Sequence, residues 1–221
     1  INNDFKKLIH KKNIALVGPV DSKENNAEEI DSFDIVVRLD YSYYLKGCDK
    51  RFKGLKTDIT YFNAQEIKKF FTYSKDPFPQ DLKYVCIKNK SYLQIIRNIN
   101  PNISSRCITF DQVDGIIGHL NMIPLIILDL LCYEPNLIKI FHANLFLTLD
   151  TFDGYRPPEL NKASSISESF LKRAFISHDP ILQYNMLSNL FNSQKIKGDE
   201  GFSYVMSLGL NEYLSKLEEN F

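Results

Sequence analysis

Short apolar runs that end in a glycine or a polar residue recur along the first two thirds of the chain. They occupy Asn13–Gly18, Asp34–Leu39, Asp58–Phe62, Tyr84–Ile87, Arg106–Phe110 and Leu137–Phe141. Short continuous apolar runs are typical of strands that are buried on both faces of a parallel sheet. Polar connections and stretches with helical periodicity, such as Ser91–Asn98, separate the runs. This alternation predicts an α/β fold in which helices flank a mainly parallel sheet.

The last third of the chain has a different pattern. Residues 149–167 combine an Asp-Gly pair, a Pro-Pro pair and several serines, which is typical of a surface loop or lid. Pro180–Asn192 and Glu200–Leu217 carry apolar residues at helical spacing, and Gly198 lies between them. Gly118–Leu131, just before the last expected strand, is apolar nearly all round, which predicts a helix packed inside the fold.

The overall composition favours one globular domain. With 221 residues, of which 44% are apolar, the chain can bury one core, so we expect a single Rossmann-like domain over residues 1–221. Because the chain begins at Ile1 and not at Met, we expect it to be a fragment of a longer protein. Lys plus Arg equal Asp plus Glu at 27 each, which argues against a nucleic-acid partner. Four cysteines without a CxxC pair favour reduced thiols and a cytoplasmic location. The apolar run Met122–Cys132 is too short to span a bilayer, and any peripheral membrane association would depend on a missing segment.

Polar residues lie where three of the expected strands end. Gly18 closes the first run, Arg38 and Asp40 close the second, and Asn63 follows the third. Ligands of open parallel sheets bind at the carboxyl ends of the strands, so these residues predict a nucleoside pocket. The chain has neither a GxGxxG fingerprint nor a Walker lysine, and a tight turn without any ligand would explain Gly18 equally well.

The residues around the second strand resemble a known family motif. The run EIDSFDIVVRLD is similar to the EID-x-x-D-x-V-x-R-x-N core of the large sialylmotif of sialyltransferases, and the later GLKTD is similar to the G-x-K-T-x element that ends this motif. The matching residues are Glu29, Ile30, Asp31, Asp34, Val36, Arg38, Gly54, Lys56 and Thr57. The resemblance covers Asn13 to Asn63 and implies a sialyltransferase-like fold, a variant of the GT-A type. In that family the motif binds the cytidine nucleotide of the donor, a role that the resemblance implies for Gly18, Asp40 and Asn63.

Two positions depart from the family pattern. The family usually has Gly-Asn-Ser where residues 18–20 are Gly-Pro-Val, and Asn where this chain has Asp40. Proline has no backbone N–H, so Pro19 cannot donate one to a phosphate, although its place in the turn keeps it among the expected donor-binding residues. The resemblance therefore implies a CMP-activated acidic sugar, either sialic acid or a related ulosonic acid such as Kdo, and a carbohydrate acceptor.

A second segment is similar in layout to the small sialylmotif. A glycine turn ends at Gly118, an apolar helix follows, and a strand leads to His142 and Asn144. Ala143 stands where the family has a glycine. A core helix and a core strand explain most of these residues, but Gly118, His142 and Asn144 border the expected pocket and are candidate donor-binding residues.

His178 is the candidate catalytic base. Asp179 is a good N-cap and Pro180 suits a first helical turn, which places His178 just before a helix N-terminus. The positive end of a helix disfavours an imidazolium ion and keeps the ring neutral, as a general base requires. In the sialyltransferases that the chain resembles, a histidine late in the chain takes the proton of the acceptor hydroxyl. The other interpretation is an ordinary histidine beside a helix cap.

No metal or cofactor is expected. The chain has no Asp-x-Asp sequence of the kind that holds a divalent metal on a nucleotide diphosphate, and a monophosphate leaving group can be stabilised by hydroxyl and amide donors. Tyr155 and Arg156, in the lid-like loop, are candidates for that task. They would otherwise be a turn-packing tyrosine and a solvated arginine.

Several alternatives stay open at the level of sequence. Arg38 is either a pocket residue or a structural residue buried against Asp31 or Asp34. An inverting transfer with a histidine base is the leading hypothesis, and a retaining transfer in which Asp40 or Asp153 forms a covalent adduct is the second. A nucleotide-binding module without catalysis is the third. A dinucleotide oxidoreductase is the weakest, because its glycine fingerprint is absent.

Overall fold

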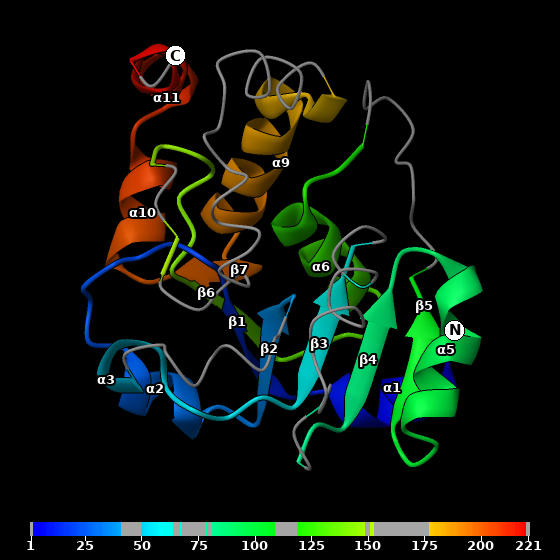
Figure 1. Cartoon of the computed structure of the whole chain (residues 1–221). Helices are drawn as coiled ribbons and strands as arrows, with labels where there is room; N and C mark the ends of the chain where they lie inside the picture. The colour runs from blue at the N-terminus through cyan, green and yellow to red at the C-terminus, as the bar shows by residue number, and fades with distance from the viewer. Residues whose placement is uncertain are drawn as a thin grey trace.

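The computed structural model describes residues 2–40, 50–63, 67, 78, 81–108, 119–148, 151–152 and 177–219. Within this part of the chain the strands form one seven-stranded sheet in the order β5-β4-β3-β2-β1-β6-β7, and every neighbouring pair is parallel. Figure 1 shows the sheet running across the molecule. The structure therefore confirms the predicted α/β fold with a parallel sheet.

Five of the strands lie where the apolar runs predict them, and a sixth, β5, begins two residues before its predicted run and overlaps it only at residues 106–107. The bounds are β1 (Asn13–Val17), β2 (Ile35–Leu39), β3 (Ile59–Phe62), β4 (Tyr84–Ile87), β5 (Ser104–Cys107) and β6 (Leu137–Phe141). The first four of these strands, apart from Asn13, are buried throughout, as expected for interior strands. The seventh, β7 (Ile196–Gly198), extends the sheet beyond β6 and was not predicted.

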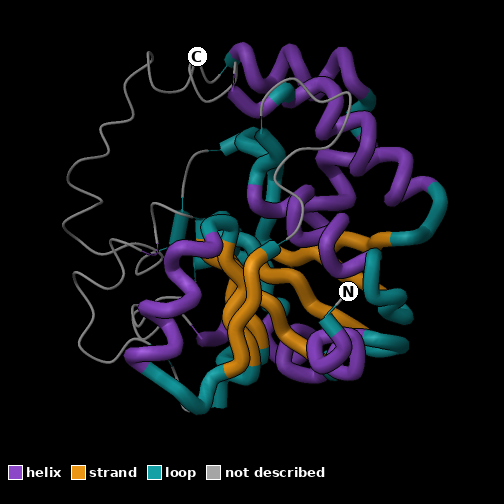
Figure 2. The backbone as a smooth tube through the Cα atoms, turned by 90° about the vertical axis from the view of Figure 1, so that its right-hand side faces the viewer, coloured by secondary structure: helices purple, strands orange, loops and turns teal. Residues whose placement is uncertain are grey.

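Helices cover both faces of the sheet, as Figures 1 and 2 show. They are α1 (Asn3–Ile9), α2 (Ala27–Ser32), α3 (Lys50–Lys53), the 3-10 turn η2 (Lys90–Tyr92), α5 (Leu93–Ile99), α6 (Met122–Leu131), α9 (Pro180–Asn192), α10 (Glu200–Ser207) and α11 (Leu210–Glu218). The expected single helix over Glu200–Leu217 is wrong, because the chain breaks at Gly209, whose φ of 74° lies in the left-handed region.

The core is divided by the sheet. On one face, α1, α6, α9, α10 and α11 pack against side chains such as Leu16, Tyr61 and Ile140 in the largest hydrophobic cluster. On the other face, α2 packs over β1, β2 and β6, and α5 packs over β3 and β4. Helix α6 is buried nearly all round, as its sequence predicts.

A buried polar group lies inside the larger cluster. The Arg106 guanidinium of β5 and the Tyr61 hydroxyl of β3 both donate to Oδ2 of Asp129 on α6, the latter over 2.6 Å. The Arg106 guanidinium also lies 4.1 Å from the centre of the Phe5 ring. Burial raises the pKa of the Asp129 carboxyl, and the Arg106 charge opposes this. The group ties α6 to the sheet through charge-assisted hydrogen bonds.

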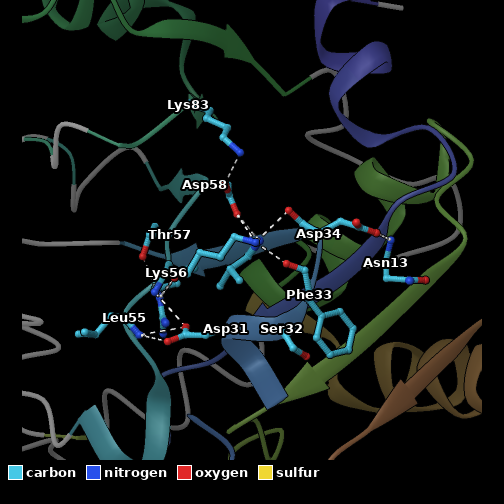
Figure 3. A network of polar contacts seen from close by, with 12 residues as sticks. Asn13, Asp31, Ser32, Phe33, Asp34, Leu55, Lys56, Thr57, Asp58 and Lys83 are labelled. Atoms are coloured by element: carbon cyan, nitrogen blue, oxygen red, sulfur yellow. Dashed lines mark hydrogen bonds and ion pairs between the residues drawn. The ribbon is translucent and has the colours of Figure 1, made fainter. Parts of the chain in front are cut away.

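Residues of the sialylmotif-like segment form a clamp at the amino edge of the sheet, which Figure 3 shows from close by. The Asp31 carboxylate accepts the backbone N–H groups of Leu55 (2.9 Å) and Lys56 (3.0 Å). Gly54, immediately before them, has a φ of 65°, and a Cβ there would lie 2.4 Å from Oδ1 of Asp31. The loop before β3 therefore needs both the aspartate and the glycine.

Lysine and aspartate side chains complete this clamp. The Lys56 ammonium donates to the backbone oxygens of Phe33 and Asp34, and it lies 3.8 Å from Oδ2 of Asp58. That Oδ2 accepts the N–H of Val36 over 2.8 Å, and Oδ1 pairs with Lys83 at 2.6 Å. Each of these residues lies at the start of a strand or just before one, so the clamp joins the amino ends of β2, β3 and β4.

Candidate functional site

The residues that follow the strands lie along the carboxyl edge of the sheet, opposite the clamp. In sheet order they are Lys88 after β4, Asn63 after β3, Asp40 after β2, Gly18 after β1, His142 after β6 and Asp199 after β7. The predicted candidates Gly18, Asp40, Asn63 and His142 thus share one edge, where ligands of such sheets bind. Their side chains differ in exposure, and this difference separates structural residues from those that can meet a ligand.

The turn at residues 18–20 is fully engaged with its own chain. The Gly18 N–H donates to the Phe141 oxygen (2.8 Å), the Val20 N–H donates to the His142 oxygen (3.0 Å), and Pro19 has no N–H. A Cβ on Gly18 would lie 2.4 Å from the His142 oxygen, so the glycine lets two backbone segments approach each other. In this conformation the turn has no N–H group left to offer a phosphate.

The carbonyl groups of the same turn anchor other segments. The Pro19 oxygen accepts the Phe152 N–H (3.1 Å), and the Val20 oxygen accepts the ammonium of Lys53 (2.5 Å). The Lys53 side chain is 1% exposed and lies 4.6 Å from the centre of the Phe152 ring. This buried lysine was not predicted, because nothing in its sequence context distinguishes it from a solvated one.

Arg38 is a structural residue in this conformation. Its side chain is only 3% exposed. Its Nε donates to the Thr57 hydroxyl (2.9 Å) and to the Lys56 oxygen (3.1 Å), and Nη2 donates to the Lys53 oxygen (2.8 Å). The structural interpretation of Arg38 therefore fits, but these partners are not the Asp31 or Asp34 that the sequence suggested. The guanidinium holds the segment between α3 and β3 with its five-donor fork.

His142 is also turned inward. It is 1% exposed, its Nδ1 lies 3.2 Å from the Ser22 hydroxyl, and its Nε2 lies 3.0 Å from the Phe52 oxygen. Because a carbonyl only accepts, Nε2 carries the proton and donates it. Burial, with the nearby charge of Lys53, lowers the pKa of His142 to about 3, so the ring is neutral. The backbone N–H of His142 donates to Asp199 (2.6 Å).

The side chains of Asn144 and Asp199 form hydrogen bonds with residues that follow them closely in the sequence. The Asn144 side chain donates to the Thr148 hydroxyl (2.7 Å) and accepts the Phe146 N–H (3.2 Å). Asp199 caps α10 by accepting the Phe202 N–H (2.8 Å), and burial raises the pKa of its carboxyl to about 6. Asp199 was missed because the strand that it follows was missed.

Asp40 and Asn63 are brought together. Both are half-buried, and Oδ1 of Asp40 accepts the Asn63 N–H over 3.3 Å. Asp40 has a φ of 43°, a left-handed conformation that Asp and Asn tolerate better than other non-glycine residues. This explains how Asp stands where the resembled motif has Asn, since both side chains suit the same backbone. Polar oxygens at two neighbouring strand ends can bind the donors of a nucleoside.

Lys88 continues this row toward the next strand. Its backbone N–H donates to the oxygen of Phe62, the residue before Asn63 (3.3 Å), and its half-buried side chain donates to the Leu120 oxygen (3.2 Å). Lys88 directly follows the run Tyr84–Ile87, so the strand-end rule that selected Asn63 could also have selected Lys88.

His178 lies just before α9, outside the sheet, and is linked to the sheet edge through residues 119 and 120 and Lys88. Its Nδ1 is 2.7 Å from the His119 oxygen, and the His119 N–H donates to the Ser177 oxygen (2.8 Å). The carbonyl requires the proton on Nδ1, which leaves the lone pair on Nε2, and no described residue forms a hydrogen bond with Nε2. Asp179 caps α9 by accepting the Leu182 N–H (3.0 Å), as expected. Burial is the first cause that lowers the pKa of His178, and the ring is therefore held in its basic, neutral form.

The remaining candidates lie outside the described residues. These are Gly118, Tyr155, Arg156 and Asp153, together with most of the expected lid at residues 149–167. Among the residues that the structure describes, no three His, Cys, Asp or Glu side chains are grouped as metal ligands. No helix in the described ranges has the length and apolar character needed to cross a membrane.

Comparison with known proteins finds similarity in structure only. No protein-family model and no curated protein matches the chain. A mammalian sialyltransferase in complex with Gal-beta-1-3GalNAc-ortho-nitrophenol matches with a TM-score of 0.57 and 15% identity, over 89% of this chain and 72% of that chain. Another mammalian sialyltransferase structure matches with 0.57 and 15%, over 89% and 71%.

A bacterial structure matches as well. The sialyltransferase CstII from Campylobacter jejuni, in complex with a substrate analogue, cytidine-5'-monophosphate, has a TM-score of 0.51 and 12% identity, over 86% of this chain and 80% of that chain. At these identities the matches establish a shared fold. The chain therefore has the Rossmann-like α/β fold of sialyltransferases, as the sialylmotif-like segment predicted.

Proposed function

We propose that this chain is a glycosyltransferase that moves an acidic sugar from a CMP-activated donor to a hydroxyl group of a carbohydrate acceptor. The donor sugar is sialic acid or a related ulosonic acid such as Kdo. The transfer inverts the anomeric centre and needs no metal. The shared fold supports this class, and two of the similar structures are complexes with cytidine-5'-monophosphate and with a disaccharide derivative, ligands of the kind that we propose here.

The observation that carries the proposal is the orientation of His178. Its Nδ1 proton is held by the His119 oxygen at 2.7 Å, so Nε2 is the basic atom. Half-burial keeps the imidazole neutral, and a neutral imidazole is the form that accepts a proton. The Asp40–Asn63 pair, at the carboxyl edge of the sheet, supplies polar groups for the nucleoside.

The proposed reaction is a single displacement. Nε2 of His178 takes the proton of the acceptor hydroxyl while the oxygen forms a bond to the anomeric carbon. The bond between that carbon and the phosphate oxygen breaks, and the electron pair leaves with CMP. Attack opposite the leaving group inverts the centre. Because the 18–20 turn has no spare N–H, we propose that side chains bind the phosphate, with Tyr155 and Arg156 as candidates.

A thermal-shift panel of CMP, UDP, GDP and NAD tests the donor class. We expect CMP alone to raise the melting temperature, because a ligand that binds only the folded protein stabilises it by mass action. Stabilisation by UDP or GDP would overturn the donor assignment, and stabilisation by NAD would revive an oxidoreductase.

Replacement of His178 tests the base. We expect His178→Ala to lower the rate of CMP release by about 10²–10⁴-fold, the usual contribution of general base catalysis, while CMP binding is retained. His119→Ala is the matched control, because it removes a neighbouring exposed imidazole but keeps the backbone oxygen that orients His178. Equal losses in both variants, or unchanged turnover in His178→Ala, would remove His178 from this role.

In the retaining alternative, Asp40 is the candidate nucleophile that forms the covalent adduct with the sugar. Its carboxylate is half-buried at a strand end and holds a left-handed backbone conformation, a kind of strain that is common at functional sites. A retained anomeric configuration in the product, with an adduct mass on Asp40, would replace the inverting mechanism. CMP binding without any cleavage of CMP-sugars would instead indicate a binding module.

A further inference from the structure

One short segment before α6 is held by three side chains from different parts of the chain. His178 binds the oxygen of residue 119, Lys88 binds the oxygen of residue 120, and Oε1 of Gln183 on α9 accepts the N–H of residue 121 over 2.8 Å. We call residues 119–121 the bridging segment. The His119 N–H also donates to the Ser177 oxygen, so the segment lies against the start of α9.

The bridging segment sets the proton position on His178. The hydrogen bond from Nδ1 to the residue 119 oxygen favours the tautomer whose lone pair is on Nε2. The oxygens of residues 119 and 120 belong to adjacent peptide groups joined only by the φ and ψ of Leu120, so the bonds from Lys88 and Gln183 that fix the second group restrain the first. Lys88, at the carboxyl end of β4, is anchored through its own N–H to the end of β3. It therefore links the bridging segment to the rigid sheet.

The charges around His178 come from several elements. Lys88 from the β4 edge and His119 from the bridging segment both lower the pKa of His178, after the larger effect of burial. Asp179, on the other side, turns its carboxylate to the N–H of Leu182 to cap α9. The N-terminus of α9 adds a partial positive charge. Lys88 is thus the permanently charged cation among these side chains, whereas His119 is a cation only when it is protonated.

We propose that Lys88 is a positioning residue for His178: it holds the bridging segment so that the residue 119 oxygen binds the Nδ1 proton, and its ammonium disfavours protonation of Nε2. This inference rests on the proposed role of His178 as the base. Lys88 lies outside the sialylmotif-like segment, and its action is through His178 and not through the substrate.

Three variants separate the charge of Lys88 from its anchoring. Lys88→Met removes both the charge and the donor, Lys88→Arg keeps both, and Gln183→Leu removes a different anchor of the same segment without changing any charge. We expect Lys88→Met to move the acid limb of the pH profile of kcat/KM to higher pH. Lys88→Arg should restore the wild-type profile, and Gln183→Leu should lower the plateau without moving the limb.

Imidazole NMR of ¹⁵N-labelled protein tests the same inference without turnover. The His178 signals are identified by their loss in His178→Ala. We expect wild type to show the Nδ1–H tautomer, and Lys88→Met to show a mixture of tautomers and a higher titration midpoint. An unchanged tautomer and midpoint in Lys88→Met would overturn the inference, as would an equal shift in Gln183→Leu. If wild type cleaves no CMP-sugar, the proposed function fails, yet the NMR result still decides the role of Lys88.

Discussion

Replacing Gly54 by alanine tests whether the sialylmotif-like residues hold the fold together. Gly54 has a φ of 65°, which costs an L-residue roughly 1–2 kcal/mol. The new Cβ would also lie 2.4 Å from Oδ1 and 2.8 Å from Cγ of Asp31, so that carboxylate must move away from the two N–H groups that it accepts. Losing these solvent-exposed hydrogen bonds costs about 1–2 kcal/mol more. We expect Gly54→Ala to lower the free energy of unfolding by about 3 kcal/mol.

Gly209 provides a matched control. It has a similar φ of 74°, but a Cβ there meets nothing within 4 Å. Gly209→Ala should therefore show the backbone cost alone, roughly 1–2 kcal/mol. Urea denaturation at equilibrium, with midpoints compared at a common slope, measures both variants. Asp31→Ala should cost about 1–2 kcal/mol, and the double variant Asp31→Ala/Gly54→Ala should cost less than the sum of the single variants, because the clash is then relieved. Equal costs for Gly54→Ala and Gly209→Ala would refute this account of the clamp.

Two further predictions concern buried carboxylates. Asp129→Asn should lower the free energy of unfolding by about 3–5 kcal/mol in the same urea assay, because it leaves the Arg106 charge buried without its counter-ion; a loss below about 1 kcal/mol would contradict the ion pair. The pKa of Asp199 is raised to about 6, so the folded protein binds this proton more tightly than the unfolded chain, and wild-type stability falls as pH rises through 6. Relative to Asp199→Asn, wild type should gain on the order of 2 kcal/mol between pH 7 and pH 4, and parallel stability curves would rule this out.

The interior strands could be predicted because their signal is local. Asn13–Val17 and Ile35–Leu39 are apolar on both faces, and such short runs are typical of the interior strands of a buried parallel sheet. β7 could not be predicted, because Ile196 is its one buried residue and pairing with β6 is what makes it a strand. The break at Gly209 was not predicted either, because the apolar residues keep their helical spacing through α10 and α11 on both sides of this glycine.

The candidate site was predicted in position but not in side-chain direction. The strand-end rule placed Asp40 and Asn63 correctly along one edge, where they meet. The same rule selected Arg38 and His142. Their side chains point into the fold, where they form hydrogen bonds with carbonyl and hydroxyl groups. Those partners come from loops distant in sequence, so only the folded chain shows which polar strand ends stay accessible.

The clamp at the amino edge has a consequence for how such chains descend from a common ancestor. The stability of the fold depends on Asp31, Gly54 and Lys56, and this dependence does not change with the substrate that binds at the opposite edge of the sheet. A gene copy under selection for stability alone would keep these residues after losing its chemistry. Inheritance of the motif therefore traces the ancestry of the scaffold. Descent of the proposed activity would be followed through Asp40, Asn63 and His178, the residues that we propose for the site.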